Sequence, residues 1–311
     1  MGISKKELFT AGYLNLYRTG ELRARVEELK NRLRCCNTCP HHCEVDRLAG
    51  ERGFCRTGSN PVVASYGPHF GEESVLVGSK GSGTIFFTYC VMRCVFCQNF
   101  EISQLGEGEE ITTEALADIM ISLQRRGCHN INLVSPTHVI PMIVEAVYLA
   151  VPKGLAVPLV YNTGGYEDVA TLKLLDSIID IYMPDVKFAD NQKARKYTGC
   201  RSYFDVAKAA IREMHRQVGD LKIDSQGLAV KGLLVRHLVL PNNLADSEAV
   251  LKFLAEDISP NTVVNIMAQY HPAYRTSHYP ELARRIRREE YAHVVEFARA
   301  LGMDRAMFSL W

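Results

Sequence analysis

Six short apolar runs alternate with helical patterns over residues 84–301. Turn residues bound each run, and we predict strands at 84–89, 131–135, 157–162, 178–183, 232–240 and 262–268. From apolar residues at helical spacing, we predict helices at 112–126, 138–151, 167–176, 202–218, 245–256 and 287–301. This alternation predicts an α/β fold with a parallel sheet, because parallel strands need a crossover connection that is usually a helix.

A cysteine triplet directly follows the first predicted strand. Cys90, Cys94 and Cys97 have the spacing CxxxCxxC, with Phe96 before the last cysteine. Three thiolates in one tight loop suit a 4Fe–4S cluster in which one iron has no protein ligand. Closed zinc sites almost always have four ligands, and no fourth ligand lies at a suitable spacing nearby. The triplet therefore favours a reactive cluster over a zinc knuckle or a structural cluster.

The triplet with its aromatic residue resembles the signature of the radical S-adenosylmethionine (SAM) superfamily. The following Gln98-Asn99 is similar to the activating enzymes of glycyl-radical enzymes. The resemblance implies a partial (β/α)6 TIM-type barrel, preceded by a cysteine-rich metal-binding extension. It also implies an electron donor such as flavodoxin or ferredoxin.

The resemblance further implies a reaction. In that superfamily the open iron chelates SAM, the reduced cluster passes an electron to the sulfonium, and the 5′-deoxyadenosyl radical removes a hydrogen atom from a substrate. We expect the same chemistry here on a protein or small-molecule substrate, with activation of a glycyl-radical enzyme as the narrower expectation. The alternative is a metal-stabilised binding or scaffold protein with structural clusters only. The open triplet disfavours it, because a scaffold has no need for a three-thiolate site.

Residues just after the predicted strands are candidates for the SAM site, because reactive groups of α/β barrels lie at the carboxyl ends of strands. Asp185 and Lys187 match an Asp-x-Lys pair of the activating enzymes, in which the lysine is directed at the SAM carboxylate. An ordinary strand-end ion pair is the alternative. The superfamily commonly has a Gly-Gly-Glu segment for the SAM ammonium where this chain has Ser135-Pro-Thr137. We expect Thr137 or backbone carbonyls to take over that role.

Three more strand ends resemble the activating enzymes. His271 stands in a segment similar to Pro-Tyr-His, whose histidine helps to hold the methionyl end of SAM. Arg236, followed by His237, is expected to contact the ribose or carboxylate, with a satisfied core group as the alternative for either. Residues 162–165, Asn-Thr-Gly-Gly, form either a cofactor contact or a plain turn. The predicted cofactor-binding residues are Phe96, Asn99, Thr137, Asp185, Lys187, Arg236 and His271.

A second cysteine group precedes the predicted sheet. Cys36, Cys39, Cys43 and Cys55 provide four thiolates, which can close a zinc site or hold an auxiliary 4Fe–4S cluster. The spacing leaves both metals open. We expect His41 and His42, which lie between these cysteines, to face solvent rather than a metal. The pattern Cys-x2-Cys-Pro-x2-Cys ahead of the barrel that carries the triplet is similar to the arrangement in the branch of pyruvate formate-lyase activating proteins.

The chain divides into three predicted parts: a helical segment over 1–34, the cysteine-rich metal-binding segment over 35–83 and the barrel over 84–311. The formal net charge of +1 offers no basic excess for a phosphate backbone, so we expect no nucleic-acid partner. Eight of the ten cysteines, the seven of the two groups and the spare Cys35 beside Cys36, fall into two clusters, which indicates a reducing cytoplasm. The longest apolar stretch, 139–151, is too short to span a bilayer, so we expect no membrane partner.

Overall fold

The apolar runs form a sheet in the computed structural model, which describes residues 9–308. Its strands are β1 (Val62–His69), β2 (Ser82–Phe87), β3 (Glu109–Glu110), β4 (Ile131–Val134), β5 (Leu159–Thr163), β6 (Ile181–Pro184), β7 (Lys222–Ile223), β8 (Ala229–Leu238), β9 (Val263–Met267) and β10 (Met307–Phe308). Hydrogen bonds link them in the order β10-β9-β8-β6-β5-β4-β2-β1-β3, and β7 pairs with β8.

Six of these strands, β2, β4, β5, β6, β8 and β9, are parallel neighbours and coincide with the six predicted runs. The prediction of an α/β fold with a parallel sheet is therefore confirmed. Within the described residues the sheet is open, because β3 and β10 lie at opposite ends of the strand order. The fold is thus a partial barrel. β1 runs antiparallel to β2 and extends this sheet with a strand from the cysteine-rich segment.

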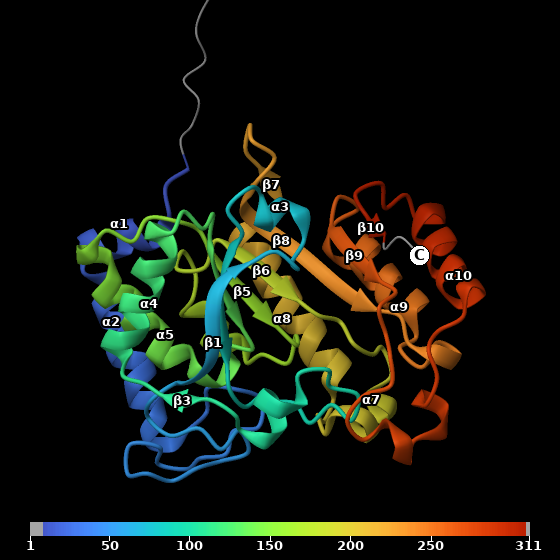
Figure 1. Ribbon diagram of the computed structural model, residues 1–311, viewed down its shortest axis with the longest axis horizontal. Coiled ribbons are helices and arrows are strands. Elements are labelled where there is room, and N and C mark those ends of the chain that lie inside the picture. Colours follow the sequence, from blue (N-terminus) through green and yellow to red (C-terminus); the bar gives the residue numbers. More distant parts are fainter. Residues whose placement is uncertain (1–8, 309–311) are drawn as a thin grey trace, which may run out of the picture.

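The helices pack outside the strands (Figure 1). They are α1 (Gly12–Thr19), α2 (Glu21–Asn31), α3 (Ser74–Val77), α4 (Thr113–Arg125), α5 (Ile140–Ala150), α6 (Val169–Lys173), α7 (Asn191–Thr198), α8 (Tyr203–Val218), α9 (Ser247–Lys252) and α10 (Arg288–Ala300). All six predicted barrel helices have a counterpart here, and α7 is an addition. α4 begins where its sequence predicts, because the Thr112 side chain accepts a hydrogen bond from the Ala115 N–H at 3.2 Å.

The predicted helical segment 1–34 contains two helices instead of one. Gly20 separates α1 from α2 with φ at 80°, a left-handed conformation that favours glycine. The apolar stripe of α2 is buried through Leu22, Val26 and Leu29, and this helix packs against α5. Residues 1–8 of the predicted segment lie outside the described residues.

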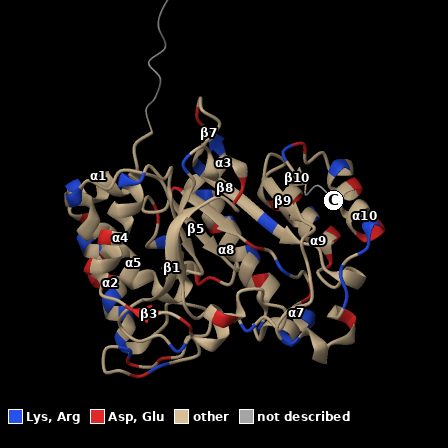
Figure 2. Cartoon of the chain, in the orientation of Figure 1, with Lys and Arg blue, Asp and Glu red and all other residues tan. Residues whose placement is uncertain are grey.

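Charged residues are spread over the elements of the fold. Figure 2 shows basic and acidic positions interspersed along the helices and loops, which fits the net charge of +1. Among residues 9–308, no helix combines the length and apolar character needed to cross a membrane.

Candidate active site

The carboxyl ends of the parallel strands surround a cavity of about 280 Å³. Its walls come from the loop after β2 and from the ends of β4, β5, β6, β8 and β9. Eight of the predicted site residues line it: Cys90, Cys94, Cys97, Phe96, Asn99, Asp185, Lys187 and Arg236. The structure thus brings the cysteine triplet and the charged strand ends to one place.

The loop of the cysteine triplet is held in place by backbone contacts. The N–H groups of Arg93 and Val95 donate to carbonyls of the segment 197–198, at 2.7 and 2.9 Å. The Met92 N–H donates to the Cys90 Sγ at 3.4 Å. Burial raises the pKa of the Cys90 thiol to about 11, so its thiolate needs a bound cation as a partner.

The donor set fits a 4Fe–4S cluster. Three soft ligands from one loop, Cys90, Cys94 and Cys97, face a common cavity. Across residues 9–308, no group of three or more Cys, His, Asp or Glu side chains converges as ligands of a single ion do. The cysteines of a 4Fe–4S cluster bind different iron atoms, so they do not converge on one point.

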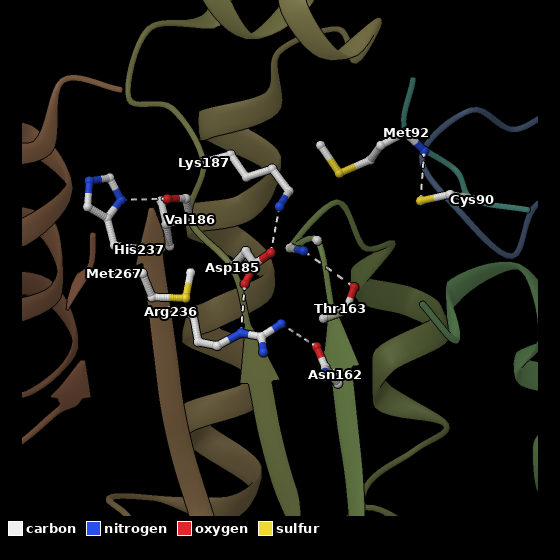
Figure 3. Close-up of polar contacts among 12 residues, drawn as sticks. Cys90, Met92, Asn162, Thr163, Asp185, Val186, Lys187, Arg236, His237 and Met267 are labelled. Carbon is white, nitrogen blue, oxygen red and sulfur yellow. Dashed lines mark hydrogen bonds and ion pairs between the residues drawn. The ribbon is translucent and has the colours of Figure 1, made fainter. Parts of the chain in front are cut away.

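A half-buried ion network lines the cavity at the ends of β6 and β8 (Figure 3). Asp185 accepts from Lys187 Nζ at 2.5 Å and from Arg236 Nε at 2.9 Å. Arg236 also donates to Asn162 Oδ1 at 2.7 Å and pairs with Glu72 at 3.4 Å. The backbone fixes this corner, because the Asp185 N–H bonds to β5 at 2.8 Å.

The charges of this network are mutually stabilised. Burial alone would raise the pKa of Asp185, but Lys187 and Arg236 outweigh it and lower that pKa below its usual range. Burial opposes the charged form of Lys187, but Asp185 and Cys94 more than offset it and raise its pKa. The site therefore presents a permanently charged ammonium to the cavity, which suits an anionic group such as a carboxylate.

The other predicted cofactor residues are placed differently. Thr137 is buried outside the cavity lining, and its hydroxyl donates to Glu167 at 2.6 Å. His271 is exposed, with its Nδ1 3.2 Å from Gln98 Nε2 at the rim. His237, the neighbour of Arg236, is a core residue that contacts the Val186 carbonyl at 2.7 Å.

Glu167 is a buried carboxyl group that no sequence motif predicts. It accepts hydrogen bonds from Thr137 at 2.6 Å, from Tyr161 at 2.9 Å and from Thr163. Burial raises its pKa to about 7, although these hydrogen bonds work in the opposite direction. Glu167 lies four residues after Thr163, but a lone glutamate in a loop forms no recognisable pattern. The sequence therefore offers no usable signal for it.

Glu167 should make the stability of the protein depend on pH. A carboxyl group whose pKa rises on folding, here from 4.5 to about 7, stabilises the folded state fully below pH 4.5. This contribution is lost as the pH rises through about 7. The free energy of unfolding of Glu167→Gln, relative to that of wild type, should therefore rise by on the order of 3 kcal/mol between pH 5 and pH 8. Thermal unfolding of both proteins across this range measures the difference.

Asp180 supplies a second, independent test of this prediction. Its carboxyl group is also buried with a pKa raised to about 7, but it accepts from the Leu159 N–H, at the start of β5 away from the cavity. Asp180→Asn should show the same pH trend, and the two variants should add. A Glu167→Gln difference that does not change with pH would contradict the assigned pKa.

The N-terminal cysteines also lie close together. Burial is the main cause of the raised pKa of Cys39, and the neighbouring thiols of Cys55, Cys36 and Cys43 add to it. The Phe54 N–H donates to the Cys43 Sγ at 3.3 Å. Within residues 9–308 no three of these thiols converge on one point as the ligands of a zinc ion do, whereas the thiols of a 4Fe–4S cluster bind different iron atoms.

The prediction that His41 faces solvent is wrong. Its ring is half-buried and stacks on Phe54 with centroids 3.8 Å apart, while its Nε2 lies 2.7 Å from the Val91 carbonyl oxygen. His42 is exposed, as expected, and contacts Asp168 at 3.2 Å. The sequence could not distinguish the two histidines, because the difference arises from the triplet loop, which lies 50 residues away.

Comparison with known proteins gives the class that this fold and site define. The family model described as "Radical SAM superfamily" matches residues 84–254. The chain belongs to the radical SAM superfamily. Members of this family use a 4Fe–4S cluster and SAM for radical chemistry, and the protein is therefore an enzyme of this class.

Individual relatives cover most of the chain. The uncharacterized protein MJ0674 of Methanocaldococcus jannaschii is 33% identical over 91% of this chain and 80% of its own length. MJ0808 of the same organism is 25% identical over 84% and 79%. Streptococcus suis SuiB bound to S-adenosylmethionine matches with 12% identity and a TM-score of 0.48, over 71% of this chain and 48% of SuiB. The chain thus spans about half the length of that structure.

Proposed function

We propose that the protein cleaves SAM reductively at a cluster held by Cys90, Cys94 and Cys97 and removes a hydrogen atom from a protein or small-molecule substrate. The observation that carries this proposal is the shared cavity of the triplet and the Lys187–Asp185–Arg236 network. When bound, the reduced cluster supplies one electron to the SAM sulfonium, which yields the 5′-deoxyadenosyl radical.

The residues of the chain bind and orient the cofactor. We assign Lys187 to the SAM carboxylate and Arg236 to the carboxylate or ribose. Phe96 is buried against Phe188 and Tyr270, so it forms a rigid apolar wall beside the triplet. Apolar walls of this kind keep water away from a reactive radical.

The SAM ammonium needs acceptors at the end of β4. Thr137 is turned toward Glu167 at 2.6 Å, so we favour the second expectation, backbone carbonyls, at this position. Ser135 lines the cavity there, and its φ of 57° is an uncommon left-handed conformation for a serine. Backbone strain of this kind often occurs at binding sites, which supports a role for this turn.

Within this function, we infer activation of a glycyl-radical enzyme as the narrower role. Asp185 and Lys187 at the end of β6, together with Gln98-Asn99 after the triplet, support it. An electron donor such as flavodoxin or ferredoxin and a cytoplasmic location belong to the same proposal. So does a second metal site, zinc or 4Fe–4S, at Cys36, Cys39, Cys43 and Cys55.

An anaerobic turnover experiment tests the function. Protein reconstituted with iron and sulfide is mixed with SAM and dithionite, and 5′-deoxyadenosine is measured by chromatography and mass spectrometry. We expect 5′-deoxyadenosine above the level of a protein-free control, and deuterium in it when a deuterated substrate is present. A fully loaded cluster that yields no 5′-deoxyadenosine would favour the scaffold alternative.

A further inference from the structure

Two contacts join the loop of the cysteine triplet to the N-terminal cysteine group. His41 Nε2 lies 2.7 Å from the Val91 carbonyl oxygen, and Arg93 Nη2 donates to the Phe54 carbonyl at 2.6 Å. Val91 and Arg93 lie inside the triplet motif, whereas His41 and Phe54 lie beside N-terminal cysteines. Each contact therefore joins a residue of the triplet loop to a residue of the N-terminal group, and both residues lie within two positions of a predicted cysteine ligand of their own group.

Aromatic rings fill the space around these contacts. His41 stacks on Phe54 with centroids 3.8 Å apart, and Tyr166 packs edge-on against His41 at 5.4 Å. The Arg93 guanidinium lies 4.5 Å from the centroid of the Phe54 ring. Stacked rings and a hydrogen bond give electrons a short path between the two groups, and tunnelling rates fall steeply with path length.

A buried cation indicates that the N-terminal thiols are metal-bound. Arg47 is 1% exposed; its Nη1 lies 3.8 Å from the Cys36 Sγ, and its other nitrogens donate to the Gly58 carbonyl. No carboxylate in the described part of the chain forms a salt bridge with it. A buried guanidinium is costly without an anionic partner, and metal-bound thiolates supply one.

We propose that Cys36, Cys39, Cys43 and Cys55 hold a second 4Fe–4S cluster that relays electrons to the cluster on the triplet. This inference rests on the proposed SAM chemistry. A zinc ion needs ligands that converge on one point, and no three candidate ligands do so among residues 9–308, whereas the thiolates of a 4Fe–4S cluster bind different iron atoms. The triplet loop lines the cavity proposed for SAM, whereas Val91 and Arg93 of the same loop lie outside the cavity lining and contact the N-terminal group, so we assign electron entry to that side. His42 on that group is 51% exposed, so the group reaches the surface.

The electrons balance in this scheme. A reduced one-electron carrier loses one electron to the second cluster, which passes the same electron to the cluster on the triplet. That electron enters the sulfonium of SAM, whose carbon–sulfur bond breaks into methionine and the 5′-deoxyadenosyl radical. Each SAM molecule thus consumes one carrier electron, and no proton is taken up or released.

Metal content and reduction kinetics test the relay. Wild type should bind about eight irons per chain, and Cys36→Ala/Cys39→Ala about four. With SAM present, the double variant should lose reduction of its remaining cluster by photoreduced flavodoxin, followed by electron paramagnetic resonance after rapid freezing. Dithionite, a small reductant, should still support 5′-deoxyadenosine formation. That second arm tests the proposed SAM chemistry separately, because it bypasses the relay.

His41→Ala keeps all four cysteines, so it tests the path if the double variant does not fold. It should retain about eight irons but slow the flavodoxin-driven reduction, whereas the matched control His42→Ala should behave as wild type. Fully reduced wild type should also show magnetic coupling between two paramagnetic clusters. About one zinc and four irons per wild-type chain, or equal flavodoxin-driven rates in wild type and the double variant, would overturn the relay.

Discussion

Replacement of Cys90, Cys94 and Cys97 by alanine is expected to abolish the formation of 5′-deoxyadenosine from SAM. The three thiols are the soft ligands that line the cavity, and alanine offers iron no donor atom. Without the cluster, no group in the cavity can deliver a single electron to the sulfonium. Anaerobic reconstitution followed by chromatography of the nucleoside products measures this loss.

The control for the triplet is a cysteine elsewhere in the fold. Cys128 is buried at 2% exposure near the start of β4, away from the cavity lining. Cys128→Ala should keep both its iron content and its SAM cleavage, whereas the triple variant should lose about four irons per chain. SAM cleavage above background in the triple variant would move the reactive cluster away from this loop.

The sequence predicted the parts of the fold that are encoded locally. Each of the six parallel strands is a short apolar run, and burial on both faces requires that composition. α7 escaped prediction because its sequence, Asn191–Thr198, is mostly polar and buries only Ala194, Tyr197 and Thr198. The break at Gly20 had a visible signal, since glycine often ends a helix in the left-handed conformation.

The site was predictable where a motif fixes both residue types and spacing. The triplet and the Asp185-x-Lys187 pair are motifs of this kind, and the structure brings both to one cavity. The contact of His41 with Val91 and the burial of Glu167 depend on segments that meet only after folding, so no local pattern marks them. Thr137 and His271 show the converse, because their strand-end positions did not decide where their side chains point.

We expect Lys187→Met to weaken SAM binding about ten- to a hundredfold, because a charge-assisted hydrogen bond to the carboxylate contributes about 1.5 to 3 kcal/mol. Methionine keeps the length of the side chain but removes its charge. Asp185 stays ionised in the variant, because Arg236 still donates to it at 2.9 Å. Its carboxylate then faces the carboxylate of SAM without the intervening ammonium, which favours the larger loss. Calorimetric titration of SAM into cluster-loaded protein measures the affinity.

Three further variants separate cofactor binding from a structural ion pair. Adding Asp185→Asn to Lys187→Met removes the repelling carboxylate, so part of the affinity should return if Lys187 binds SAM. Lys153, which pairs with Asp118 at 2.6 Å on the surface, supplies the control, and Lys153→Met should bind SAM as wild type does. His271→Ala should have a smaller effect than Lys187→Met, because that histidine is exposed at the rim of the cavity. If Lys187→Met binds SAM with unchanged affinity, the Lys187–Asp185 pair is an ordinary strand-end salt bridge. Arg236 is then the cation that binds SAM in this site.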